Sequence, residues 1–68
     1  MERVEERESI KKLVLLEYKC KGLLGAITEY GRLGFHGSAI LTTETLIDTA
    51  REMHERIIQL KAFGPEQS

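Results

Sequence analysis

The side chains that could take part in chemistry are few in this 68-residue chain. Its one cysteine, Cys20, excludes an intrachain disulfide. A reactive thiolate needs a cationic or helix N-terminal surrounding. Lys19 and Lys21 flank Cys20 in sequence but would point away from it on a helix. Cys20 is therefore expected to act as a small apolar core residue.

The two histidines do not form a metal-binding pattern. His36 and His54 have no third and fourth ligand at a suitable spacing, so we expect no metal and no cofactor. His54 lies one helical turn from Ala50 and from Ile58, which predicts a partly buried structural histidine. The glycine-rich segment 31–41 matches neither common phosphate-loop pattern.

Asp48 is the one acidic residue that stands out. It lies near the start of the second predicted helix. One interpretation is structural: a carboxylate in the first turn interacts favourably with the positive end of the helix dipole and pairs with Arg51. A functional role is the alternative.

Two apolar stripes at helical spacing would position these residues. The first stripe consists of Leu13, Leu16, Cys20, Leu23, Ile27 and Tyr30. It predicts a helix over residues 9–30, with Ser9 as a candidate N-cap and an earlier start as the alternative. The charged segment 1–8 before it is expected to be frayed. The second predicts a helix over residues 43–63, and it consists of Leu46, Ala50, Met53, Ile57 and Leu60. Glu17–Lys21 and Glu52–Arg56 are spaced as ion pairs within the helices, and we expect the second pair on the outer face.

The segment 31–42 between the stripes predicts a turn. Gly31 is expected to end the first helix in the left-handed conformation. Thr42 or Thr43 is expected to cap the second helix, which Gly64–Pro65 would stop.

These elements predict an all-α fold, with residues 1–68 forming one domain, an antiparallel two-helix hairpin. A hairpin this small leaves aliphatic side chains outside its seam, and pairing two hairpins into a four-helix bundle would cover them. The predicted partner-binding residues are Val14, Leu15, Leu24, Ile47 and Ile58. Gly22, Gly25 and Ala26 form a low patch that another backbone could approach.

The charge balance and the short apolar runs argue against two classes of partner, nucleic acids and membranes. Ten basic residues against eleven acidic ones give a net charge of −1, so we expect no nucleic-acid partner. Acidic and basic residues mix on both helices, and the longest apolar run is Leu13–Leu16, so we expect no membrane partner and a cytoplasmic location.

The helix pattern Leu16-Glu17-x-Lys19-x-Lys21-x-Leu23-Leu24-x-x-Ile27-x-x-Tyr30-Gly31, followed by a turn and an acidic helix start, resembles the sporulation-initiation aspartyl-phosphate phosphatase family. Members of that family are helical hairpins that dephosphorylate a response-regulator receiver domain. Their S-Q-E-L-D signature aligns with Glu44-Thr45-Leu46-Ile47-Asp48, where the aspartate and the preceding aliphatic residue match. The resemblance implies a catalytic role for Asp48.

Two functions follow from the sequence. The first is a protein-interaction or regulatory module, possessing no enzyme site of its own, that binds a protein partner or a second copy. The alternative is a phosphatase-like regulator of a phosphorylated receiver domain, in which Asp48 positions the attacking water.

Overall fold

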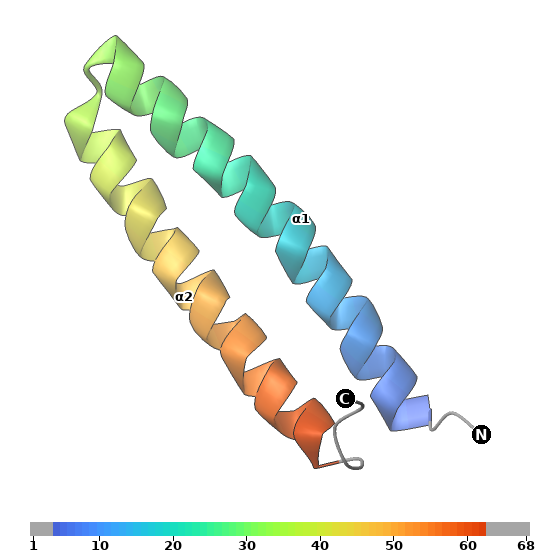
Figure 1. Ribbon diagram of the computed structural model, residues 1–68. Coiled ribbons are helices and arrows are strands. Elements are labelled where there is room, and N and C mark those ends of the chain that lie inside the picture. The colour runs from blue at the N-terminus through green and yellow to red at the C-terminus, as the bar shows by residue number, and fades with distance from the viewer. Residues whose placement is uncertain (1–3, 63–68) are drawn as a thin grey trace.

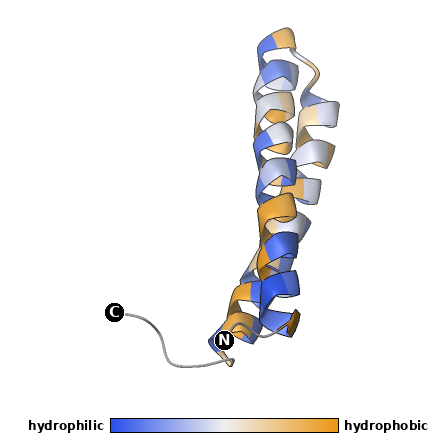
Figure 2. Ribbon diagram, turned by 90° about the vertical axis from the view of Figure 1, so that its right-hand side faces the viewer, coloured by the Kyte–Doolittle hydropathy of each residue, from blue (hydrophilic) through white to orange (hydrophobic). Residues whose placement is uncertain are grey.

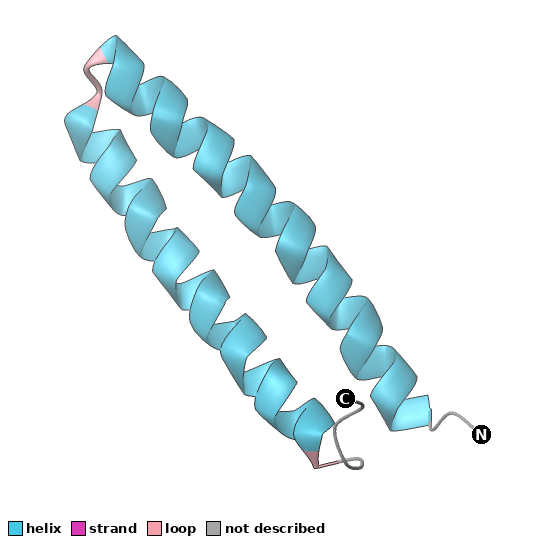
Figure 3. Cartoon of the chain, viewed as in Figure 1, coloured by secondary structure: helices cyan, strands magenta, loops and turns pink. Residues whose placement is uncertain are grey.

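The computed structural model describes residues 4–62 as two helices. Helix α1 covers Val4–Leu33 and helix α2 covers His36–Lys61, with Gly34 and Phe35 between them (Figures 1 and 3). The two helices pack against each other, and the start of α1 and the end of α2 lie at the same end of the molecule (Figure 1). The all-helical hairpin predicted from the sequence is confirmed.

Helix α1 begins at Val4, so the prediction of a frayed segment before Ser9 is wrong for residues 4–8. Glu5 and Glu6 lie in the first turn, where carboxylates interact favourably with the positive end of the helix dipole. Lys11 pairs with Glu8 one turn later at 3.8 Å. The charges of this segment therefore suit the first turns of a helix.

The turn is much shorter than the predicted segment 31–42, and Gly31 is not its left-handed residue. Gly34 has a φ of 83°, a conformation that glycine adopts without steric cost. Its N–H donates to the carbonyl of Gly31 at 3.2 Å, and the N–H of Phe35 donates to the carbonyl of Tyr30 at 2.8 Å. This bond pair is a Schellman motif, which satisfies the last carbonyls of α1.

Thr42 and Thr43 lie inside α2, so neither is its N-cap. Their hydroxyls donate to the carbonyls of Ser38 and Ala39 at 2.8 and 2.7 Å. Such bonds let threonine occupy a helix interior with its hydroxyl satisfied. Phe35 is the N-cap and makes no side-chain capping bond. The predicted end of the helix at residue 63 and the Gly64–Pro65 stop lie outside the described residues.

The seam between the helices confirms the predicted stripe of α1 and corrects that of α2. Buried and half-buried residues of α1 recur at heptad spacing, and they include Leu13, Leu16, Cys20, Leu23, Ile27 and Tyr30. On α2 they include Leu46, Thr49, Met53, Arg56 and Leu60. Ala50 and Ile57, predicted as core, are exposed, and Ile57 keeps 51% of its surface.

Partners within α2 explain how Thr49 and Arg56 occupy seam positions. The Thr49 hydroxyl donates to the carbonyl of Thr45 at 2.9 Å, so its burial leaves no polar group unpaired. Arg56 lies half-buried with its guanidinium 3.9 Å from the Glu52 carboxylate. A long basic side chain can bury its aliphatic part while its charged group stays in water. Between them, the Cys20 thiol contacts the Met53 sulfur at 3.6 Å, which agrees with a packing role for Cys20.

The hairpin buries little apolar surface. Among residues 4–62, Leu16 is the one buried hydrophobic residue, and no side chain is fully enclosed. Apolar and polar residues alternate along both helices (Figure 2), and several large apolar residues of each helix are exposed. In the described part of the chain, neither helix combines the length and apolar character needed to cross a membrane.

Candidate functional site

Two faces flank the seam, and helix geometry separates their residues. Successive residues of a helix are rotated by about 100°. Because the chain reverses at Gly34–Phe35, residues that directly follow a seam residue lie on the same side of both helices, and those that directly precede one lie on the other side. The two sides have different chemistry.

The side that follows the seam is the more apolar of the two, although Glu17, Lys21 and His54 also lie on it, and we call it the apolar face. Its apolar members are Ile10, Val14 and Leu24 of α1, and Ile40, Ile47, Ala50 and Ile57 of α2. The large members expose between 43% and 61% of their surface. On α2 the stripe Ile40, Thr43, Ile47, Ala50, His54 and Ile57 repeats at spacings of three and four. This second heptad stripe is the pattern of a helix that packs against another helix.

Three of the five predicted partner-binding residues lie on the apolar face, namely Val14, Leu24 and Ile47. Ile58 is exposed at its margin, and Leu15 lies on the opposite face. The sequence reasoning missed Ile10, Ile40, Ala50 and Ile57. The heptad spacing of Ile40, Ile47, Ala50 and Ile57 was the signal that could have identified most of them.

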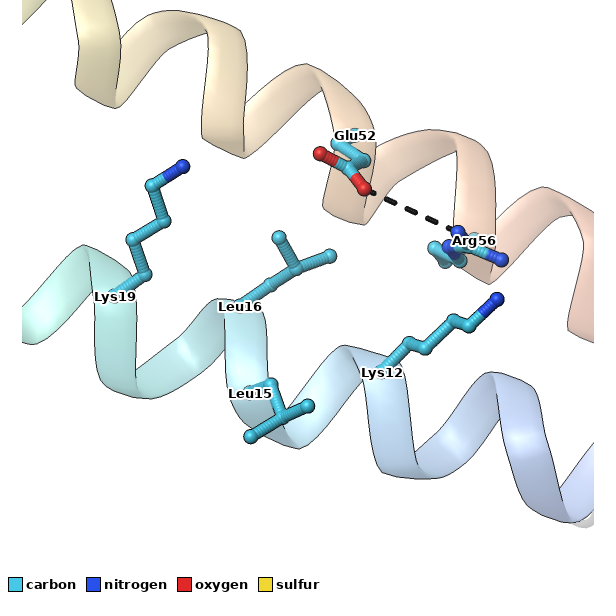
Figure 4. A pocket seen from close by; sticks show the side chains of 6 residues that line it. All are labelled: Lys12, Leu15, Leu16, Lys19, Glu52 and Arg56. Carbon is cyan, nitrogen blue, oxygen red and sulfur yellow. Dashed lines mark ion pairs between the residues drawn. The ribbon is translucent and has the colours of Figure 1, made fainter.

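The opposite face is polar and carries a shallow groove between the helices, of about 300 Å³. The groove is lined by Lys12, Leu15, Leu16, Lys19, Glu52 and Arg56 (Figure 4). Lys12 and Lys19 extend from α1 on either side of Leu16, while Glu52 pairs with Arg56 on α2 (Figure 4). The Glu52–Arg56 pair predicted for the outer face therefore lines this groove.

Asp48 lies on the polar face, exposed, more than three turns after the start of α2. The prediction of a first-turn carboxylate is therefore wrong, because α2 begins at His36. Within residues 4–62 no ion pair joins Asp48 to Arg51. The carboxylate is open to solvent.

The histidines and glycines complete the candidate residues. His54 is exposed, so the prediction of a partly buried histidine is wrong, and His36 is exposed at the start of α2. A methyl group added to Gly22 or Gly25 would meet no atom within 4 Å, so α2 does not approach the small-residue patch. No three of the described His, Cys, Asp and Glu residues group together as metal ligands.

Comparison of the chain with protein-family models, curated proteins and solved structures gives no match. The functional argument therefore rests on the geometry of the two faces. One face gathers exposed aliphatic residues of both helices around the Glu17–Lys21 pair, and the other carries a shallow groove lined by side chains of both charges.

Proposed function

We propose that this hairpin is a protein-interaction module, with no enzyme site of its own, whose apolar face joins two copies into an antiparallel four-helix bundle. The observation that carries this proposal is the second heptad stripe of α2, whose isoleucines Ile40, Ile47 and Ile57 stay 61%, 46% and 51% exposed in the single hairpin. Exposed aliphatic residues are ordinary when scattered, but their gathering on one side of two helices is typical of an association surface.

The dimensions of the apolar face suit a second copy. Helix α2 has 26 residues, which gives a face about 39 Å long at 1.5 Å per residue. Two helices side by side are about 20 Å wide. The face therefore offers about 800 Å², the area that each partner contributes to a standard interface.

The charges near the centre of the apolar face also permit self-association. Glu17 and Lys21 form an ion pair at 3.3 Å and neutralise each other beside Val14 and Leu24. A twofold interface brings the same surface of each copy together. An uncompensated charge near the axis would therefore face the same charge on the other copy and be repelled. The internal pair avoids that repulsion in the middle of the face.

Light scattering over a concentration series tests the dimer. We expect twice the chain mass of 7.7 kDa for the native protein and the chain mass for Ile47→Glu, because a carboxylate in the apolar face would be desolvated. Leu41→Glu is the matched control, since Leu41 is also exposed on α2 but lies on the polar side. A native protein that stays monomeric at all concentrations contradicts the proposal.

A second candidate function is a phosphatase-like regulator of a phosphorylated receiver domain. The exposed Asp48 carboxylate, on the face that a dimer would leave open, supports this candidate together with the resemblance of the helix pattern. The receiver would supply the acyl phosphate and its metal, and Asp48 would position water. Asp48→Ala should then abolish dephosphorylation while Glu55→Ala, on the same exposed row, should not. Equal rates for both variants and the native protein would contradict this candidate.

A further inference from the structure

The α1 row of the apolar face carries its two charges in a symmetric order. Glu17 and Lys21 lie between Val14 and Leu24, and all four residues are exposed on the side that follows the seam. Val14 and Leu24 are each five residues from the midpoint of this row, and Glu17 and Lys21 are each two residues from it. Along α1 the row is therefore apolar, acidic, basic and apolar, and reversing its direction puts a lysine where the glutamate was.

A contact across the seam shows which residue of α2 lies beside that midpoint. The Cys20 thiol lies 3.6 Å from the Met53 sulfur, so these two residues are at the same level along the hairpin. The start of α1 and the end of α2 lie at the same end of the molecule (Figure 1), so each step after Met53 matches a step before Cys20. His54 therefore lies at the level of the midpoint, and Ile57 lies within about one residue of the level of Glu17.

We propose that α1 packs on α1 of the second copy and runs opposite to it, with the twofold axis at the midpoint of the row. This arrangement rests on the dimer proposed above and specifies which helices meet in it. Val14 would contact Leu24 of the second copy, and Glu17 would pair with Lys21 of that copy, because a twofold axis exchanges positions at equal distances from it.

The charges at the centre of this interface would alternate in sign. Glu17 and Lys21 already pair at 3.3 Å within one copy, and the second copy would place a lysine over the glutamate and a glutamate over the lysine. Opposite charges that face each other across an interface fix how the partners align. His54 would face His54 of the second copy, a position that suits an imidazole because histidine can be uncharged near neutral pH.

The other twofold arrangement places α1 on α2 of the second copy, with matching levels side by side. Glu17 would then lie against Ile57, an aliphatic residue that exposes 51% of its surface in the single hairpin. Covering a carboxylate with an aliphatic side chain removes its water and costs free energy. The order of charges along α1 therefore favours α1 on α1.

Charge exchange at Glu17 and Lys21 tests this arrangement, with light scattering of the full chain over a concentration series. Glu17→Lys alone would bring four lysines together at the axis, and Lys21→Glu alone would bring four glutamates together. We expect each variant to dimerise at least about tenfold more weakly than the native chain. An equimolar mixture of the two should dimerise within about threefold of the native affinity, because each lysine of one variant would face a glutamate of the other.

The variants E8K and K11E are the matched controls, because Glu8 and Lys11 form an ion pair of α1 at 3.8 Å outside the apolar face. We expect both to dimerise like the native chain. The double variant E17K/K21E keeps opposite charges at the two positions and should dimerise as well. Single variants that dimerise like the native chain, or a mixture that stays monomeric, would overturn this arrangement and leave the dimer standing. A monomeric native chain would overturn both.

Discussion

Leu15 and Leu16 are adjacent in the chain but lie in different environments, which gives a direct test of the seam. Leu16 is 9% exposed and Leu15 is 66% exposed. Leu16→Ala should lower the free energy of unfolding by about 2–3 kcal/mol, because it removes buried methyl groups from the seam. Leu15→Ala should cost less than about 1 kcal/mol. Urea unfolding followed by circular dichroism measures both, and equal losses would mean that the seam is misplaced.

Thr49 makes a second prediction at the scale of single residues. Its side chain is 3% exposed, and its hydroxyl bonds to the carbonyl of Thr45. Thr49→Val should change the free energy of unfolding by less than about 1 kcal/mol, because that carbonyl keeps its backbone partner. Thr49→Asp should cost more than about 2 kcal/mol, because it buries an unpaired carboxylate. The urea midpoints of the two variants measure the difference, and a harmless aspartate would place Thr49 outside the seam.

Sequence reasoning failed at Thr49 and Arg56 for a physical reason. It looked for apolar residues and so selected Ala50 and Ile57, which belong to the neighbouring stripe of α2. The Thr49 hydroxyl bonds to the carbonyl of Thr45, and the Arg56 guanidinium has Glu52 of the same helix as its ion-pair partner. A polar residue whose partner lies one turn away can face the seam at little cost, and residue type alone does not reveal this.

Among the elements, the turn shows how a correct mechanism was assigned to the wrong residue. A left-handed glycine was predicted to end the first helix, but that glycine is Gly34 rather than Gly31. Three glycines lie at similar spacing, at positions 31, 34 and 37, and each is compatible with that role in sequence. Threonines at positions 42 and 43 then suggested a late helix start, although both bond to carbonyls of their own helix.

Alanine substitutions at Gly34 and Gly31 should change the free energy of unfolding in opposite directions. Gly34→Ala should lower the free energy of unfolding by about 1–2 kcal/mol, because alanine is strained at a φ of 83°. Gly31→Ala should raise it by about 0.5–1 kcal/mol, because Gly31 lies in α1 and an added methyl meets no neighbour. Thermal unfolding of the two variants provides the measurement. Destabilisation by Gly31→Ala would move the end of α1 back to the predicted position.

At the scale of the whole molecule, the hairpin itself was predictable because two long heptad stripes separated by glycines leave few other folds. The stripe of α1 was correct in every member. The two faces were not predictable as units, because they depend on the rotation of α2 about its axis. That rotation turns Ile57 outward and brings Arg56 into the groove.

The proposed dimer makes a prediction about the stability of the whole molecule. If folding is coupled to pairing, the thermal midpoint of the native chain should rise with protein concentration, because mass action favours the associated state. Ile47→Glu should remove that dependence and lower the midpoint, whereas Leu41→Glu should preserve the dependence. A midpoint that is independent of concentration in the native chain would indicate that the hairpin folds alone.

Ile57 separates the stability of the hairpin from that of the dimer. It keeps 51% of its surface in the single hairpin, so Ile57→Ala should cost less than about 1 kcal/mol in the Ile47→Glu background. In the native background, where a second copy would cover it, the same change should cost about 2–3 kcal/mol. The difference between these values is a coupling energy, measured by urea unfolding of the four chains of the cycle. A cost that is the same in both backgrounds would mean that Ile57 is not covered by a second copy, and the apolar face would then belong to a different protein.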